Sequence, residues 1–351
     1  MRYTPISQLK GNMILGQELY DATGRMLLAK HTTLTEENIA YITFLGIPGV
    51  YIDDKFSEEA KVEEIIRPEV KKAALRMISE VFIQASQDDT IEQEAEAEFR
   101  RNITMIVETV LDKRDVMDSL IAVKTYDDST FFHSANVAVM AGIIGAKMRL
   151  SRIELDDLVT AGFLHDIGKV FIDPDIINAP RKLTDEERVQ MMDHPMLGYD
   201  FLLEEYSFSK GVLEGVYQHH EWYNGDGYPR RLRGDSITLL ARILKVADVY
   251  DAMTGKRSYH DPYLPSDVLE YIMGRSGMEF DPDVVQVMST EMCVYPVGCE
   301  VGLSDGRRGI IVENHRGFIM RPTIKLLDTD ELLDLANDRD AWNLTITRLL
   351  I

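Results

Sequence analysis

The stretch GFLHDIGK, from Gly162 to Lys169, places a histidine and an aspartate side by side within an apolar, helix-like run. Burying an ionised aspartate costs free energy unless the carboxylate is paired or binds a metal. Imidazole is a common ligand of first-row transition metals, and carboxylates bind them as well. Taken alone, the His165–Asp166 pair has two interpretations: a metal site, or a hydrogen-bonded couple near the end of a helix.

Further histidines and an aspartate lie in neighbouring apolar segments that have the character of consecutive helices. They are His133 in TFFHSANVAVM, His194 in MMDHPMLG, His219 and His220 at the end of GVLEGVYQHH, and Asp248 in ILKVADVYDAM. Each one alone is most simply a hydrogen-bonded core residue. Together with His165 and Asp166 they favour a helical bundle that directs several metal ligands inward.

The order of these motifs, with LHDIGK followed by HHE and then GYP at Gly227–Pro229, resembles the HD-GYP branch of the HD superfamily of metal-dependent phosphohydrolases. LTDEERVQMMDHPMLG (183–198) and KVADVYDAMTGKRSY (245–259) match further blocks, and the resemblance runs from about Tyr126 to Asp283. It implies an all-helical domain that hydrolyses the bacterial second messenger cyclic di-GMP. It also implies two or three metals, often iron or manganese.

The resemblance implies a role for each matching residue. Asp166 would bridge two metals. The other ligands would be His165 and Asp248 at one metal, His194, His219 and His220 at the other, and His133 at the first metal or at a third. Such a pair of metals, about 3.5–4 Å apart, holds a hydroxide that attacks the phosphodiester in line, giving linear pGpG and, more slowly, GMP.

The remaining implied contacts are with the substrate. Lys169 would touch the scissile phosphate, and Tyr228 and Arg257 would contact the substrate through guanine and phosphate. Glu221 and Asp251 are either residues that orient the metal-binding imidazoles or ordinary surface or capping carboxylates.

Three positions depart from the family pattern. Members with three metals carry a glutamate four residues before the first histidine, and Ser129 stands there, so we expect two metals. Asn224 replaces the usual aspartate of the loop, with a modest effect expected because an amide still forms local hydrogen bonds. His260 stands where lysine or arginine is frequent, which predicts a weaker or pH-dependent phosphate contact.

The fold is expected to be mainly α, in four segments. Residues 1–56 would form a small α+β module, with Thr35 capping a helix, and residues 57–124 a helical extension. Residues 125–292 would form the HD-GYP domain, and residues 293–351 a β-rich segment. Apolar residues repeat at helical spacing in the extension, around Ala74–Phe82 and again around Ile103–Leu111.

Composition limits the partners of the 351-residue chain. A formal net charge of −21 argues against binding to DNA or RNA polymers but not against a small anionic ligand, because bound metals and a few cations can invert the local field. No apolar run approaches the roughly 18 residues of a membrane span, and the start lacks the apolar core of a signal peptide. The two cysteines are expected to be core or free thiols, and we expect a cytoplasmic protein of a bacterium.

Three functions remain open from the sequence. The leading one is a cyclic di-GMP phosphodiesterase. The second is a phosphodiesterase for another cyclic dinucleotide such as cyclic GMP–AMP, because base choice depends on a few contacts. The third is a noncatalytic receptor for cyclic di-GMP, which the presence of both HD and GYP disfavours. Residues 1–56 are candidates for a homodimer contact or for binding a signalling protein.

Overall fold

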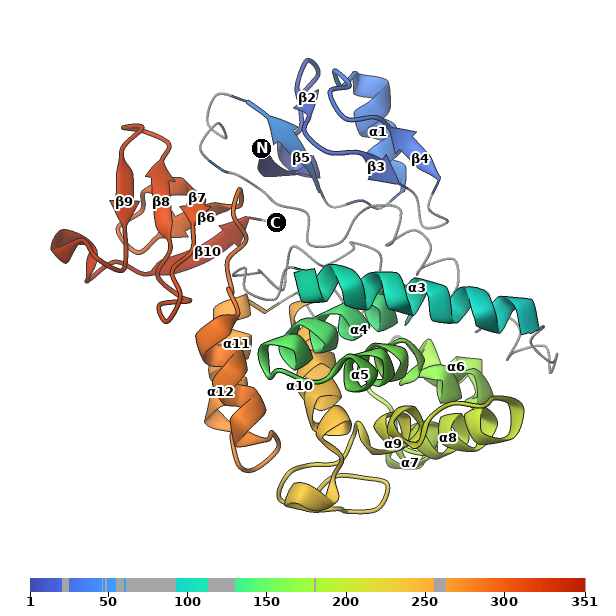
Figure 1. Cartoon of the computed structure of the whole chain (residues 1–351). Coiled ribbons are helices and arrows are strands. Elements are labelled where there is room, and N and C mark those ends of the chain that lie inside the picture. The colour runs from blue at the N-terminus through green and yellow to red at the C-terminus, as the bar shows by residue number, and fades with distance from the viewer. Residues whose placement is uncertain are drawn as a thin grey trace. The chain divides into compact units, whose positions relative to one another are not determined.

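The structure is a computed structural model that describes residues 1–20, 25–45, 47, 49–54, 60, 93–112, 130–179, 181–255 and 263–350. The predicted helix around Ala74–Phe82, and the positions Ser129, Arg257 and His260, lie outside these residues. The chain forms two compact units (Figure 1). One comprises Met1–Ile65, Val116–Asp127 and Ser289–Ile351, and the other Ile66–Asp115 and Asp128–Met288.

The second unit is helical, and its described elements follow one another along the chain. They are α3 (Gln93–Asp112), α4 (Thr130–Lys147), α5 (Arg152–Leu164), η3 (Ile167–Phe171), α6 (Pro174–Ile177), α7 (Asp185–Met191), α8 (His194–Glu205), α9 (Lys210–Gln218), η4 (Gly234–Ser236), α10 (Leu239–Thr254), α11 (Pro265–Gly274) and α12 (Pro282–Glu291). The predicted mainly α fold is therefore confirmed.

Local sequence signals explain where several of these helices begin. Ser151 and Glu154 form a capping box at the start of α5, and Thr184 and Glu187 form another at the start of α7. In each, the hydroxyl accepts a backbone N–H of the first turn while the glutamate accepts the N–H of the cap. Thr238 caps α10 in the same way through its hydroxyl.

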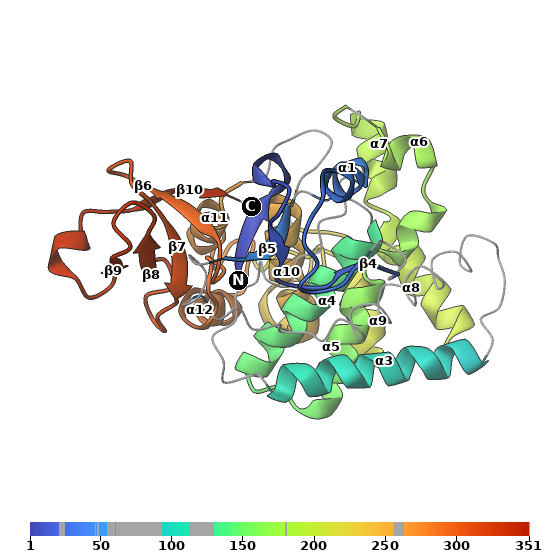
Figure 2. The same cartoon turned by 90° about the horizontal axis from the view of Figure 1, so that it is seen from above.

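Close packing of α4 with α5 and α10 forms the core of this unit. Gly162 permits the approach of α5, because a Cβ there would lie 2.5 Å from the Cα of Ala138 on α4. α3 lies along α4 and α5 (Figure 2) and buries the predicted apolar repeat, with Ile106 and Val107 fully inaccessible to solvent. The predicted periodicity of this segment is confirmed.

The N-terminal part of the first unit contains β1 (Arg2–Pro5), η1 (Ile6–Gln8), β2 (Ile14–Leu15), β3 (Leu19–Tyr20), β4 (Met26–Leu28), α1 (Glu36–Phe44) and β5 (Gly49–Asp53). β5 lies between β1 and β2 in an antiparallel sheet, while β3 and β4 pair with each other. Thr35 caps α1 as predicted and forms a capping box with Asn38.

The C-terminal part of the first unit is an antiparallel sheet in the order β10-β6-β7-β8-β9. Its elements are β6 (Glu300–Leu303), β7 (Arg308–Glu313), β8 (Thr323–Leu326), β9 (Leu332–Asp334), η5 (Arg339–Ala341) and β10 (Ile346–Leu350). The N–H of Tyr3 donates to the carbonyl of Gly298 at 2.9 Å, and Arg2 Nη1 lies 3.6 Å from Glu300 Oε2. The two terminal segments thus share one unit, while the four-part domain division stays a prediction.

Two further expectations concern the cysteines and the membrane. Cys293 and Cys299 are both buried thiols, and burial raises the pKa of Cys299. Among the described helices, none combines the length and the apolar character needed to cross a bilayer.

Candidate metal centre

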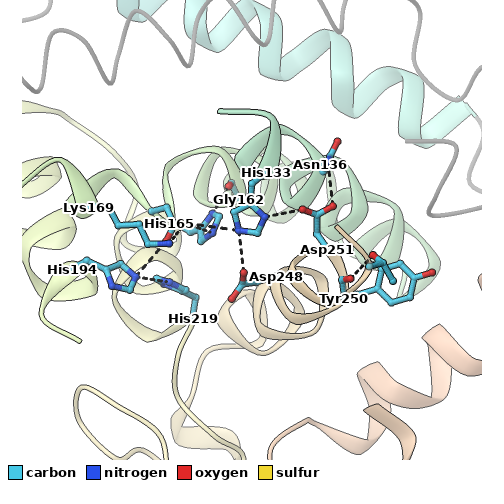
Figure 3. A network of polar contacts seen from close by, with 12 residues as sticks. His133, Asn136, Gly162, His165, Lys169, His194, His219, Asp248, Tyr250 and Asp251 are labelled. Atoms are coloured by element: carbon cyan, nitrogen blue, oxygen red, sulfur yellow. Dashed lines mark hydrogen bonds and ion pairs between the residues drawn. The ribbon is translucent and has the colours of Figure 1, made fainter. Parts of the chain in front are cut away.

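The predicted ligands come from several helical elements. Figure 3 shows five of them facing one common space: His133, His165, His194, His219 and Asp248. His133 lies on α4 and Asp248 on α10. His165 and Asp166 lie between α5 and η3, where the helix ends, and His194 is the first residue of α8. His219 and His220 directly follow α9. All these residues are within the described part of the chain, and the structure brings them together.

They form two groups that could each hold a metal ion. The first group consists of His133, His165 and Asp166, and the second of His194, His219 and His220. Within each group the potential ligand atoms lie within 4.8 Å of one another. Asp248 extends the first group, since its Oδ1 lies 3.1 Å from His133 Nε2.

Asp166 faces both groups with different oxygens. Its Oδ2 lies 3.4 Å from His165 Nε2, and its Oδ1 lies 3.3 Å from His194 Nε2. A carboxylate placed in this way can share its two oxygens between two cations. The placement is what a bridging role for Asp166 requires.

Backbone carbonyls determine which imidazole nitrogens carry hydrogen. The Nδ1 atoms of His165, His194 and His219 lie 2.8, 2.7 and 2.6 Å from the carbonyl oxygens of Gly162, Met191 and Val216 respectively. A carbonyl only accepts, so each Nδ1 donates and each neutral ring presents the lone pair of Nε2. This hydrogen bond from the second nitrogen is the usual support for a metal-binding histidine.

Two contacts show that these residues fit a metal. His165 Nε2 is buried without a hydrogen-bond partner although it lies beside the Asp166 carboxylate, which is itself an acceptor. The Nε2 atoms of His194 and His219 face each other at 3.3 Å with both rings donating through Nδ1. Opposed lone pairs at this distance repel unless a cation lies between them or beside them.

The pKa of His133 differs in direction from those of His165, His219 and His220. Burial lowers the pKa of His165, and burial together with neighbouring imidazoles lowers the pKa values of His219 and His220 well below the usual range. Burial also opposes protonation of His133, but its hydrogen bonds to Asp248 and Asp251 outweigh this and raise its pKa to about 9. His219 and His220 therefore present neutral imidazoles, the form that binds metals.

The surroundings of Asp166 and Asp248 favour the ionised form of both carboxylates. Burial alone would raise the pKa of Asp166, but His165, Lys169 and His194 outweigh it and hold the pKa well below its usual range. His133 does the same for Asp248. Lys169 Nζ forms an ion pair with Asp166 Oδ2 at 2.5 Å, so the predicted phosphate-binding cation lies at the metal centre.

Asp251 contacts the imidazole of His133, a predicted metal ligand, as the first of its two sequence interpretations requires. Its Oδ2 accepts the Nδ1–H of His133 at 2.8 Å, and its Oδ1 accepts Nδ2–H of Asn136 at 3.2 Å. Asn136 is absent from the residues predicted from the sequence. Its signal is its position three residues after His133, on the same face of α4.

Glu221 has a different role from the imidazole contact considered for it. Its buried carboxylate accepts the backbone N–H groups of Arg230 and Leu232 at 2.7 and 3.0 Å. Burial raises its pKa, and these hydrogen bonds oppose the increase. Glu221 therefore fixes the loop that follows HHE. Gly227 is required in that loop, since a Cβ would lie 2.2 Å from the nitrogen of Trp222.

Tyr228 stacks on His220, with ring centroids 4.7 Å apart and an interplanar angle of 19°. Burial raises the pKa of its hydroxyl. Asn224 donates to Asp226 Oδ2 at 2.7 Å and accepts the N–H of Asp226 at 3.0 Å, which agrees with the local hydrogen bonding expected of the amide. The substrate contact of Tyr228 stays a prediction, and Arg257 lies outside the described residues.

Known proteins resemble this chain across the same region. A sequence profile of the HD domain matches residues 115–284. Cyclic di-GMP phosphodiesterase PA4108 of Pseudomonas aeruginosa is 34% identical over 62% of this chain and 52% of that protein. The cyclic di-GMP phosphodiesterase response regulator RpfG of Xanthomonas campestris is 29% identical over 66% of this chain and 62% of that protein. The chain therefore carries an HD domain at residues 115–284, as the resemblance of its motifs to the HD-GYP branch implies.

Two further proteins similar to this chain differ in the named substrate or have a solved structure. The 3'3'-cGAMP-specific phosphodiesterase 2 of Vibrio cholerae is 33% identical over 53% of this chain and 36% of that protein. A solved structure, the HDG"Y"P protein Bd1817 of Bdellovibrio bacteriovorus, matches with a TM-score of 0.52 and 15% identity, over 81% of this chain and 96% of that one. This last likeness supports the HD-type fold alone. The chain spans only about half to three fifths of the length of the first two relatives.

Proposed function

We propose that this HD-domain protein is a metal-dependent phosphodiesterase that hydrolyses cyclic di-GMP to linear pGpG, with GMP as a slower product. The observation that carries the proposal is Asp166, whose two oxygens face two separate groups of histidines. The relatives named as cyclic di-GMP phosphodiesterases support the substrate.

The site would hold two divalent metals, iron or manganese. The residues that would bind them are His133, His165, Asp166 and Asp248 on one side, and His194, His219 and His220, with Asp166 shared, on the other. Bound metals of this kind activate water at neutral pH and polarise phosphoryl oxygens. The imidazoles fit because each of His165, His194 and His219 keeps Nε2 free of hydrogen.

The protein's own side chains would position the substrate. The Lys169 ammonium group lies beside Asp166 and is partly exposed, so it can stabilise negative charge that develops on phosphoryl oxygens. Tyr228 lies against His220, at the edge of the metal centre, where its ring would meet the nucleotide. Arg257 is proposed to contact phosphate by its match to the family motif.

A phosphodiesterase for cyclic GMP–AMP is the second candidate, supported by the similarity to the Vibrio cholerae enzyme. A noncatalytic receptor is less well supported, because the structure brings together the predicted metal ligands. A cytoplasmic location, and a homodimer or a signalling partner at residues 1–56, also belong to the proposal. They are supported by the composition and by the compact N-terminal module.

The direct test is to incubate the metal-reconstituted full chain with cyclic di-GMP and with cyclic GMP–AMP, and to separate the products by chromatography. Asp166→Ala is the site variant, and Asp185→Ala, an exposed aspartate at the start of α7, is the matched control. We expect pGpG from the parent and the control but not from Asp166→Ala. Robust turnover by Asp166→Ala would defeat the proposed site, while binding without turnover by the loaded parent would favour the receptor.

A further inference from the structure

We infer that Glu279 is a positioning residue that holds the loop carrying Tyr228 against the helix carrying Asp248. Its importance for hydrolysis rests on the proposed function, while its structural part can be tested separately. Glu279 lies between α11 and α12, and only 5% of its surface is exposed. A carboxylate buried to this extent needs several partners.

Both oxygens of the Glu279 carboxylate have partners. Oε1 lies 3.2 Å from Lys245 Nζ. Oε2 accepts the hydroxyl of Tyr271 at 3.1 Å and the Nε–H of Arg275, also at 3.1 Å. The acid therefore joins α10, which carries Lys245, to the end of α11. Such a fully satisfied buried network fixes the geometry of the elements that it joins.

Lys245 connects this network to the metal centre. It is buried on α10, with 6% of its surface exposed, and it precedes the predicted ligand Asp248 by three residues, on the same face of the helix. The Lys245–Glu279 ion pair thus lies one helical turn from Asp248 along α10.

The turn that contains Glu279 also binds the start of the loop that carries Tyr228. The N–H of Tyr223 donates to the carbonyl of Glu279 at 3.2 Å, and the N–H of Asn224 donates to the carbonyl of Met278 at 2.8 Å. The guanidinium of Arg275, which is bound to the Glu279 carboxylate, lies 5.5 Å from the centre of the Trp222 ring. The residues directly after HHE therefore rest on a turn that Glu279 anchors to α10.

A shift of Trp222 would also move Tyr228, because both residues lie in the same loop. Gly227 lies directly against the nitrogen of Trp222, and the N–H of Tyr228 donates to the carbonyl of His220 at 3.3 Å. The Tyr228 ring stacks on the His220 ring. Loss of the Glu279 charge would therefore move the proposed substrate contact, although Glu279 does not touch the site itself.

Glu279→Gln is the main test variant, because it keeps the shape of the side chain and removes its charge. Asp281→Asn is the matched control. Asp281 is a buried acid of the same turn that pairs with Arg242 of α10 at 2.5 Å, and it accepts the N–H of Asp283 rather than one from the loop. We expect Glu279→Gln to raise KM for the cyclic dinucleotide by about tenfold to about 100-fold, with metal content unchanged. Asp281→Asn should leave KM unchanged.

A second variant separates positioning from stability. The double change Lys245→Met and Glu279→Gln leaves neither charge of this pair buried alone, so it is expected to recover stability lost in Glu279→Gln. It does not restore the carboxylate that holds Arg275 and the turn. We expect it to keep the raised KM. Recovery of both stability and KM in the double variant would overturn the inference.

Fluorescence tests the loop without substrate or metal. The chain has two tryptophans, and Trp342 is 59% exposed in the other unit, so Trp342→Phe leaves Trp222 as the reporter. In that background we expect Glu279→Gln to shift the emission to longer wavelength as Trp222 becomes more exposed, and Asp281→Asn to leave it unchanged. No shift, or an equal shift in the control, overturns the inference. Failure of the parent to hydrolyse any cyclic dinucleotide would overturn only the proposed function.

Discussion

The two groups of predicted ligands meet at Asp166 but differ in charge. The first group lies among carboxylates, with Asp248 at 3.1 Å and Asp251 at 2.8 Å from the two nitrogens of His133. The second group consists of imidazoles whose Nδ1 atoms donate mainly to backbone carbonyls. Without a metal, the first group can hold a proton on His133, while the second has only opposed lone pairs. The charges of nearby carboxylates thus favour metal binding at the first group. The directions of the imidazole hydrogen bonds favour it at the second group.

Loss of a carboxylate from the first group should have the largest effect. Asp248→Asn removes one negative charge and one ligand oxygen while its shape is kept. We expect kcat to fall by more than about 100-fold, the upper end of the effect of outer partners of a metal site. Metal analysis should show a loss at the first group only. An active variant with full metal content would show that Asp248 is not a ligand.

Displacing the histidines of the second group should have the next largest effect. A Cβ at Gly168 would lie 1.9 Å from the carbonyl oxygen of His194, so Gly168→Ala must push η3 and the start of α8 apart. We expect a loss of about 1–3 kcal/mol in the free energy of unfolding and weaker metal binding by the second group. Urea denaturation and metal titration measure the two effects.

Gly274→Ala is the control for this prediction, because a Cβ at this position of α11 would have no atom within 4 Å. It should leave both the stability and the metal affinity close to those of the parent. Equal behaviour of the two variants would contradict the close approach at Gly168.

Removal of an orienting carboxylate should have an intermediate effect. Asp251→Asn replaces the acceptor for His133 Nδ1–H and should lower the metal affinity of the first group by about 10–100-fold. Asn136→Ala removes only the donor to Asp251 and should have a smaller effect. Competition with a metal chelator gives both affinities. A larger loss in Asn136→Ala than in Asp251→Asn would contradict this order.

The smallest expected effect is the change of metal affinity with pH. Because the pKa of His133 in the folded, metal-free protein is raised to about 9, its proton is bound below that pH and must leave when a metal binds. Metal affinity of the first group should therefore rise with pH between neutrality and about 9, by at most about tenfold per pH unit. The affinity of the second group should stay flat there, since His219 and His220 are already neutral. Calorimetry in buffers of different ionisation enthalpy counts the protons released.

The sequence predicted the mainly α fold and the gathering of both groups of ligands at one site. It could do so because histidines in apolar helices need polar or metal partners inside the bundle. It did not assign Asn136, because a position three residues after His133 is a signal that many buried helix residues share. It left the role of Glu221 open, because the loop that this carboxylate binds is fixed only by long-range packing. The contact of Tyr3 with Gly298 joins two segments that are far apart along the chain, which no local pattern specifies.

Anaerobic metal analysis of the reconstituted full chain tests the central claim, that Asp166 joins two metal-binding groups. We expect two iron or manganese ions per chain in the parent, and loss from both groups in Asp166→Asn, because the amide has one oxygen and no charge and cannot bridge two metals. A steady three metals per chain, or an Asp166→Asn protein that keeps both of its metals, would contradict the claim.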